Sequence, residues 1–317
     1  MYQGSKVQNG QISYVALMDA RSIAATAASK GFLTGADELE GIDFSRPKYF
    51  FDKTIYEKRV LDCVGKANPE TEIQFGPNIK DWPAMQPLGK DLLVKCVSEI
   101  HDPVTTTDEL IPSGETSSFR SNPLGLAEFA LSRRDPQYVG EAKEVRALEL
   151  SRELKYGIIN SVGADYSADS SLVSEYKDIL DIVKSLNPEF DESSASVGST
   201  IYACKPGDGS AREQAASCQK VLGAWANIAR EYATKRYRSN LINWGMLPFL
   251  YPEEDIKKGD YIYVPDVREA VKAKNADIKA YVISAGASRE ITLKLGDMTD
   301  DERQIILDGC LINYYKH

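Results

Sequence analysis

The sequence predicts an α/β protein, in which a layered domain over residues 91–317 follows an irregular region at residues 1–90. Short apolar runs recur after residue 90 and have the length and the β-branched or aromatic content of strands. Between them lie segments whose apolar residues recur at three- and four-residue steps, as in amphipathic helices. A chain of 317 residues is long enough for one large domain with an appendage.

The first region is expected to hold a short helix and a long connection. Asp19–Gly31 has an N-cap aspartate, an alanine-rich body and a terminal glycine, which together predict a helix. From Phe32 to about Lys90, clusters of proline, glycine and asparagine are typical of a linker. Within that linker, Thr54–Lys66 is a further helical candidate.

The second region begins with a predicted strand at Asp91–Ile100. Further strands are predicted at Ser199–Cys204, Tyr261–Val264, Ala280–Ser284 and Glu290–Leu295. Amphipathic patterns predict helices at Gly140–Leu154, Leu172–Leu186 and Glu231–Gly245. Thr299 and Glu302 have the spacing of a capping box and predict the start of a final helix that runs to the C-terminus.

The composition limits the expected partners. The formal net charge is −9, whereas surfaces that bind nucleic acid or anionic membranes depend on clustered Lys and Arg, so we expect neither partner. No apolar run approaches the roughly 18 residues needed to cross a bilayer. The first residues also lack the charged and apolar parts of a signal peptide. We therefore expect a cytoplasmic protein.

Five cysteines are scattered along the chain, and no two form a C-x-x-C pair. They are Cys63, Cys96, Cys204, Cys218 and Cys310. An odd, scattered set is a poor disulfide framework, so we expect reduced and mostly buried thiols. The imidazole ligands available are His101 and His317. The spacing therefore predicts no metal or cofactor bound by this chain.

The stretch KPGDGSAREQAAS, residues 205–217, places Ser210 and Arg212 two positions apart after a glycine loop. Ser210 and Glu213 have the spacing of a capping box, and the local pattern alone favours that interpretation. The alternative is an anion site, since a helix N-terminus offers free N–H groups and an arginine offers a bidentate fork. In such a positive environment a serine hydroxyl can serve as a base. The stretch is neither a Walker loop nor a G-x-S-x-G motif.

Four segments, in order, carry a resemblance to a known family. GDGSAREQAAS resembles the G-x-G-S-S-R-E-x-A-A signature of the aconitase family. TTDELIPSGETSSFR (Thr106–Arg120) is similar to the family's T-T-D-H-I-S…G…F-R segment, with the same spacing from the threonines to the arginine. SNLINWGMLPF (Ser239–Phe249) resembles its N-L-x-x-x-G-x-L-P stretch, and the closing residues 295–316 resemble its last turn and helix.

The resemblance implies a domain organisation. The four segments belong to the family's C-terminal "swivel" domain, and Tyr14–Gly35 resembles the last helix of the preceding catalytic domain. Residues 1–90 would therefore be the end of that catalytic domain plus an interdomain linker. Residues 91–317 would be the swivel domain, with β/β/α layers.

The resemblance also implies roles for individual residues. Ser210 would be the general base that removes the proton next to a substrate carboxylate. Arg212 and Arg120 would bind substrate carboxylates, and Asp108 would be a catalytic residue that orients the network. The other substrate-binding residues would be Thr107, Gly209 and Ala211. From the residues alone, Asp108 as a turn cap and Arg120 as a surface arginine stay open as alternatives.

The implied activity is that of an aconitase-like hydro-lyase, which reversibly dehydrates a hydroxy-di- or tricarboxylate. Its [4Fe–4S] cluster would be held by domains absent from this chain, which belong either to the same parent chain or to a separate subunit. Those domains and the small hydroxy acid are the expected partners. The chain alone is expected to show no turnover, because a serine base leaves the C–O bond without an electrophile.

Three departures from the family pattern keep a second hypothesis open. Ala211 stands where the family has a serine, while Glu109 and Gln214 each stand in place of a histidine. Loss of polar groups changes discrimination strongly at a site built on polar pairing, so the substrate need not be citrate. The alternative is a non-catalytic carboxylate-binding or regulatory module with the same fold.

Overall fold

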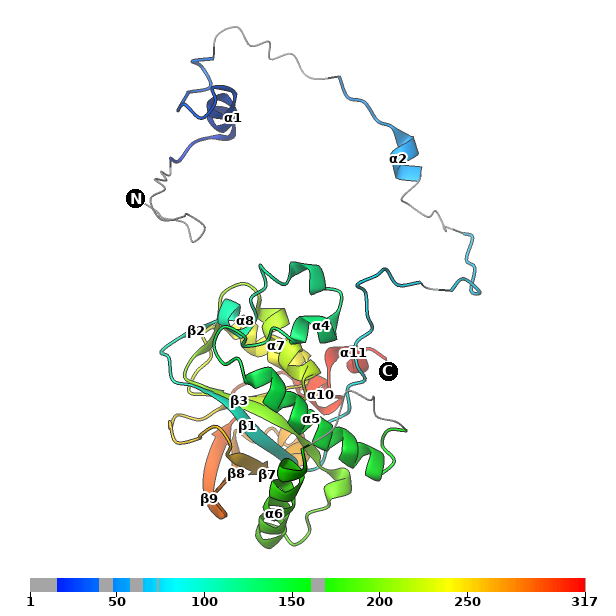
Figure 1. The fold of residues 1–317 in the computed structure, drawn as a ribbon, viewed down its shortest axis with the longest axis vertical. Coiled ribbons are helices and arrows are strands. Elements are labelled where there is room, and N and C mark those ends of the chain that lie inside the picture. The colour runs from blue at the N-terminus through cyan, green and yellow to red at the C-terminus, as the bar shows by residue number, and fades with distance from the viewer. Residues whose placement is uncertain (1–15, 40–47, 58–64, 73, 161–168, 317) are drawn as a thin grey trace. The chain divides into compact units, whose positions relative to one another are not determined.

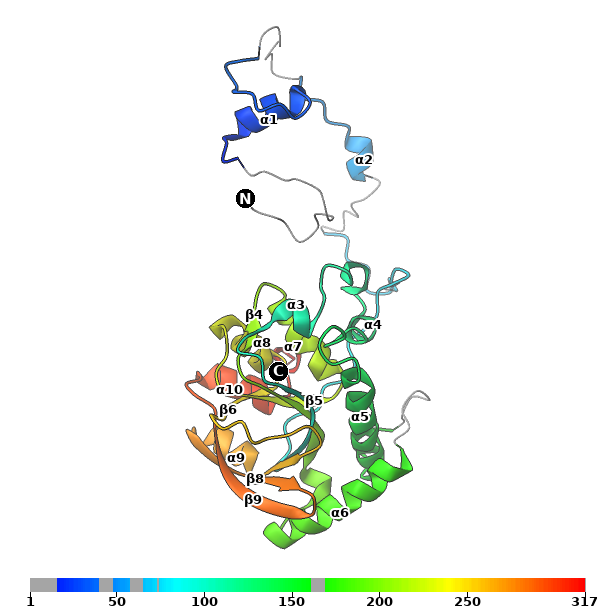
Figure 2. The ribbon, with the colours of Figure 1, turned by 60° about the vertical axis from the view of Figure 1, so that its left-hand side comes forward.

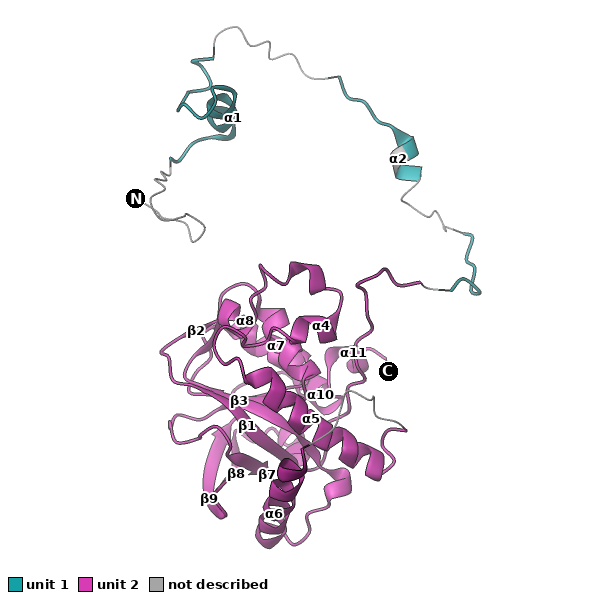
Figure 3. Cartoon of the chain, in the orientation of Figure 1, with its two compact units in different colours: residues 1–72 teal, residues 73–317 magenta. Residues whose placement is uncertain are grey.

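The computed structural model divides the chain into two compact units, residues 1–72 and 73–317, each considered by itself (Figure 3). The described residues are 16–39, 48–57, 65–72, 74–160 and 169–316. In the first unit, α1 (Ala20–Ala28) begins after Asp19, whose carboxylate accepts the N–H groups of Arg21 and Ser22. This confirms the expected N-terminal helix.

The second helix of the first unit is short. α2 (Lys53–Glu57) covers the beginning of the helix predicted at Thr54–Lys66. Residues 58–64 lie outside the described residues, as does Tyr14 at the start of the segment that resembles a catalytic-domain helix.

The last part of the expected linker belongs to the second unit and packs against its helices. The ring centroid of Trp82 lies 4.4 Å from that of Trp244. The N–H of Leu88 donates to the carbonyl of Leu307 at 3.2 Å. The chain is thus already part of the second unit before the first strand, whereas the assignment of residues 1–90 to a preceding domain and linker stays a prediction.

Seven strands of the second unit close into a barrel in the order β1-β3-β5-β6-β9-β8-β7 (Figures 1 and 2). The parallel half contains β1 (Leu92–Ile100), β3 (Ser196–Ala203), β5 (Ala224–Ala229) and β6 (Leu247–Leu250). The antiparallel half contains β7 (Tyr261–Val264), β8 (Asp277–Ser284) and β9 (Ala287–Lys294). The two halves are the two strand layers of the mixed α/β fold, whose class is confirmed.

The halves of the barrel meet at two seams. β1 pairs with β7 in antiparallel register, with Leu92 opposite Val264. β6 meets β9 where Leu250 pairs with Lys294. A separate two-stranded parallel sheet is formed by β2 (Thr105–Thr106) and β4 (Pro206–Asp208), which lie in the loops that follow β1 and β3.

Helices pack on the outside of the barrel. The longer ones are α5 (Tyr138–Lys155), α6 (Ser170–Leu186), α7 (Arg212–Val221), α8 (Lys235–Asn243) and α10 (Asp300–Leu307). The shorter ones are α3 (Thr107–Leu110), α4 (Pro123–Ala127), α9 (Val267–Lys272) and α11 (Leu311–Tyr314). α5 packs on β1 and β3, while α7 packs on β5 and contacts α4 and α8. In Figure 2, α5 and α6 lie along one side of the barrel.

The prediction of one C-terminal helix is wrong in one respect, because the segment forms two helices. The capping box of Thr299 and Glu302 starts α10 as expected. The chain then turns at Gly309, whose φ is +91°, before α11. A Cβ at Gly309 would lie 2.0 Å from the carbonyl oxygen of Gln86, so the break also lets the segment before β1 pass close by.

Two expectations from the composition can be compared with the structure. Cys96, Cys204, Cys218 and Cys310 are free and buried, as expected, whereas Cys63 lies outside the described residues. None of the helices in the described ranges is both long enough and apolar enough to cross a membrane.

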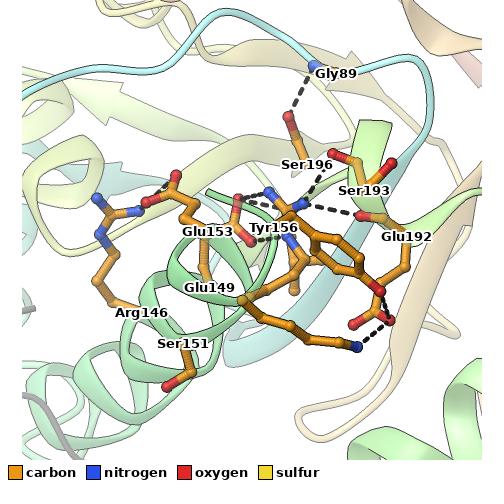
Figure 4. Close-up of polar contacts among 12 residues, drawn as sticks. Gly89, Arg146, Glu149, Ser151, Glu153, Tyr156, Glu192, Ser193 and Ser196 are labelled. Carbon is orange, nitrogen blue, oxygen red and sulfur yellow. Dashed lines mark hydrogen bonds and ion pairs between the residues drawn. The ribbon is translucent and has the colours of Figure 1, made fainter. Parts of the chain in front are cut away.

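A buried charged network fastens α5 to the start of β3 (Figure 4). The guanidinium of Arg152 donates to both carboxylate oxygens of Glu149, at 2.6 and 2.9 Å. Arg152 also donates to the carbonyl of Glu192 at 2.8 Å, and Glu149 accepts the N–H of Val197 at 3.3 Å. The charges of Arg152 and Glu149 therefore each have a partner on a neighbouring element, which offsets their loss of hydration.

Lys220 of α7 is a buried cation beside this network. Its Nζ lies 3.6 Å from the ring centroid of Trp225 and has no hydrogen-bond partner among the described residues. Burial lowers the pKa of Lys220 to about 7, and Arg146 lowers it too. Cys310, Glu149 and Glu153 act in the opposite direction.

We expect the stability cost of Lys220 to depend on pH. Between the folded pKa of about 7 and the ordinary lysine pKa of 10.5, the unfolded chain binds a proton that the folded chain releases. Stability therefore rises with pH through this window, by at most about 1.4 kcal/mol per pH unit from this group. Lys220→Met removes this contribution. Urea denaturation should therefore show that the free energy of unfolding of the variant, minus that of the parent, falls from pH 7 to pH 10.

The exposed lysine Lys272 provides the control. Lys272→Met should leave the difference from the parent constant over the same pH range, because its side chain is 46% exposed. Parallel pH profiles for the parent and Lys220→Met would contradict the assignment of a lowered pKa to Lys220.

Candidate active site

Ser210 lies in the loop between β4 and α7, and this loop is held against the start of α3. Gly209 has φ of +127°, and a Cβ there would lie 2.3 Å from Oγ1 of Thr107. The buried Thr107 Oγ1 accepts the N–H of Ala211 at 3.2 Å. Pairing of β2 with β4 joins the same two segments. The T-T-D segment and the glycine loop therefore form one structural unit.

The capping-box interpretation of Ser210 and Glu213 is wrong. The N-cap of α7 is Ala211, and no side chain caps the helix. The carboxylate of Glu213 instead accepts the indole N–H of Trp244 at 3.1 Å. Ser210 is exposed, and the first turn of α7 keeps its free N–H groups next to it.

A hollow of about 260 Å³, here called the serine hollow, opens beside Ser210. It is lined by Ser113, Arg120, Ser210, Ala211, Glu213 and Gln214. Three residues of the predicted site, Ser210, Ala211 and Arg120, thus face the same space. Arg120 follows a 3₁₀ turn at Ser117–Phe119 and is exposed.

The remaining predicted site residues lie near the serine hollow without lining it. Asp108 is exposed and forms an ion pair with Arg133, which also pairs with Glu115. These two carboxylates, Glu115 foremost, raise the pKa of Arg133. Thr107 and Gly209 hold the loop of Ser210 through their contact with each other. Arg212 is partly buried, and its Nε has no hydrogen-bond partner among the described residues. Their catalytic or binding roles stay predictions.

Glu109, which stands in place of a histidine, has a structural task here. Its carboxylate accepts the N–H of Thr106 at 2.7 Å, and its own N–H donates to Thr106 Oγ1 at 3.2 Å. This reciprocal pair is a capping box for α3. The residue that caps this turn is therefore Thr106 and not Asp108, so one alternative for Asp108 is excluded.

Three lining residues were not included in the predicted site. Gln214 lies in the first turn of α7, and its place in the serine motif, where the family has a histidine, was a usable signal. Glu213 was assigned to a cap, so its place beside the hollow was missed. Ser113 carries no sequence signal, because it comes from a loop whose path depends on the fold.

The described thiols do not provide a site for an iron–sulfur cluster. Such clusters need several thiolates converging on one point. Among the described residues, one group of possible ligand atoms lies together, and it contains a single cysteine: His101, Cys204 and Glu254. Sequence spacing did not reveal this group, because its members are far apart in the chain.

Comparison with known proteins identifies the family. Residues 144–254 match the family described as the aconitase C-terminal domain. The methanogen homoaconitase small subunit of Methanocaldococcus jannaschii is 33% identical over 110 residues, which are 35% of this chain and 56% of that protein. The chain therefore spans little more than half the length of this relative.

Two further proteins are similar. The homoaconitase small subunit of Thermus thermophilus is 30% identical over 131 residues, which are 41% of this chain and 72% of that protein. A crystal structure of 3-isopropylmalate dehydratase from M. jannaschii is 19% identical with a TM-score of 0.42, and the match covers 71% of this chain and 93% of that one. On the sequence matches, this chain belongs to the aconitase family and contains its C-terminal domain.

Proposed function

We propose that this chain is the substrate-binding and general-base part of an aconitase-like hydro-lyase that reversibly dehydrates a hydroxy-di- or tricarboxylate. The observation that carries the proposal is the serine hollow, where Ser210 and Arg120 face one space from separate segments. The names of the relatives, which are small subunits of homoaconitases, support the same class of reaction.

Ser210 is the base in this proposal. Its exposed hydroxyl lies beside the N-terminus of α7, where free N–H groups and the helix dipole favour negative charge. As an alkoxide, it would take the proton from the carbon next to a substrate carboxylate, and the electron pair left on that carbon forms the double bond. The same N–H groups would stabilise the oxyanion of the serine between turnovers.

Arg120 is the carboxylate anchor. Its guanidinium can form a bidentate pair with one substrate carboxylate, which fixes the adjacent carbon relative to Ser210. Gln214 lines the same hollow and offers an amide in place of the family's histidine. Because an amide neither titrates nor carries charge, the preferred substrate should differ from that of relatives with histidine.

The leaving hydroxyl needs an electrophile from outside this chain. A [4Fe–4S] cluster on partner domains would supply it, and the resemblance assigns that cluster to domains absent here. The relatives' names favour a separate subunit for the cluster-bearing domains. The segment that resembles a catalytic-domain helix instead favours one chain that contains them.

A non-catalytic carboxylate-binding module is the second candidate. It is favoured by Ala211 and Gln214, which replace a hydroxyl and an imidazole at the lining of the hollow. The two candidates differ in what Ser210 does, since a binding module needs no base.

Ser210→Ala separates the two candidates. The complete enzyme is assembled anaerobically from this chain, the cluster-bearing domains, iron and sulfide, and assayed on a panel of hydroxy acids. We expect kcat to fall by about 10²–10⁴, as for loss of a general base, while KM changes little.

Ser118→Ala is the matched control, because Ser118 is exposed in the neighbouring 3₁₀ turn and does not line the serine hollow. Its kcat should equal that of the parent. Equal kcat for Ser210→Ala and the parent would remove Ser210 as the base, and no turnover by any assembled enzyme would favour the binding module.

Arg120→Gln tests carboxylate binding without turnover. Loss of a charge-assisted pair is worth about 1.5–3 kcal/mol, so the Kd for 1,2,3-propanetricarboxylate, measured by calorimetry on this chain, should rise about 10- to 100-fold. Arg236→Gln, an exposed arginine on α8, should bind like the parent. An unchanged Kd in Arg120→Gln would exclude Arg120 as the anchor.

A further inference from the structure

A second hollow, here called the strand-end hollow, lies at the carboxyl ends of the parallel strands and has a volume of about 570 Å³. His101 follows β1 directly, Cys204 follows β3, and Arg230 follows β5. Glu254 comes shortly after β6. Ligand sites in α/β sheets are commonly built at this edge, because the loops after successive parallel strands converge there.

Three side chains of this hollow offer different metal ligands. One ligand atom each from His101, Cys204 and Glu254 lies within 4.8 Å of the others. The Cys204 sulfur is 3.9 Å from Oε1 of Glu254, and Nδ1 of His101 is 3.9 Å from Oε2. Bonds of about 2.0–2.3 Å in a tetrahedral zinc site place ligand atoms about 3.5 Å apart, so small side-chain rotations suffice.

A carboxylate behind the imidazole supports a ligand role for His101. Oε1 of Glu99 lies 3.7 Å from Nε2 of His101, on the side away from the contact with Glu254. Glu99 is itself fixed, because its Oε2 accepts the N–H of Lys258 at 2.7 Å. Zinc-bound imidazoles usually direct their second nitrogen to such a carboxylate, which leaves the first nitrogen as the ligand.

Both cations at the lining of the hollow, Lys205 and Arg230, form ion pairs with carboxylates. Cys204 is buried, and it lines the hollow together with Arg230. Arg230 also pairs with Glu254 and so holds that carboxylate toward the cluster. Lys205, the other cation at the lining, is occupied by Glu231 at 2.7 Å.

We propose that His101, Cys204 and Glu254 bind one zinc ion, with water as the fourth ligand. The mixed nitrogen, sulfur and oxygen set is typical of zinc with an open position. The strand-end hollow shares no lining residue with the serine hollow, so this site does not depend on the proposed hydro-lyase activity.

Cobalt provides a direct test on the full 317-residue chain. After treatment with a chelator and a reductant, titration with Co²⁺ should give the near-ultraviolet thiolate-to-cobalt charge-transfer band and the strong visible bands of a tetrahedral ion, saturating at one equivalent. Zn²⁺ should displace Co²⁺, and calorimetry should give a micromolar or lower Kd for Zn²⁺.

Variants assign the ligands. Cys204→Ser should abolish the charge-transfer band, while His101→Gln and Glu254→Gln should weaken Zn²⁺ binding at least about 10-fold, as should Glu99→Gln through the orientation of His101. Cys310→Ser, which removes a buried thiol outside the hollow, should bind Zn²⁺ like the parent. Circular dichroism checks that each variant is folded.

Several results would overturn the zinc site. One is a titration with no charge-transfer band. Another is a band that persists in Cys204→Ser, since a different thiol would then be the ligand. If Cys204→Ser does not fold, the exposed residues His101 and Glu254 still decide, because parent-like Zn²⁺ binding in both of their variants excludes the proposal.

Discussion

The contact between Thr107 and the glycine loop is the constraint on which the candidate active site depends. The Ala211 N–H donates to Thr107 Oγ1, and Gly209 lies so close to the same oxygen that a side chain at position 209 would not fit. This hydroxyl and the pairing of β2 with β4 together join the loop after β1 to the loop after β3. These contacts fix Ser210 relative to the chain leading to Arg120, as the proposed roles of base and carboxylate anchor require.

Much of the fold could be predicted where a segment carries its own signal. Tyr261–Val264 has the β-branched and aromatic content of a strand, and Leu172–Leu186 shows one apolar stripe. β5, with the sequence AWANIA, was missed because a strand buried on both faces lacks alternation and alanine favours helices. The break between α10 and α11 at Gly309 was not predicted, because the Gln86 carbonyl that packs against Gly309 is remote in sequence.

The site was predictable only as far as local motifs determine it. The resemblance of the T-T-D and serine segments to the aconitase family implied that Arg120 and Ser210 belong to one site, and both line the serine hollow. Local spacing was misleading for Ser210 and Glu213, since tertiary contact with Trp244 takes the glutamate that a cap would need. His101, Cys204 and Glu254 have no local pattern, because strand order alone brings them together.

The departures from the family pattern fall into two physical kinds. Glu109 exchanges a titratable ring for a carboxylate that caps α3, and so stabilises the helix whose first residue, Thr107, holds the glycine loop. Ala211 and Gln214 instead lie at the lining of the serine hollow. The first change, at Glu109, supports the segment that holds the loop of Ser210. The second, at Ala211 and Gln214, changes the side chains next to Ser210. Both proposed functions, a hydro-lyase and a carboxylate-binding module, need this scaffold, so the side chains at the lining of the hollow are where the two would differ.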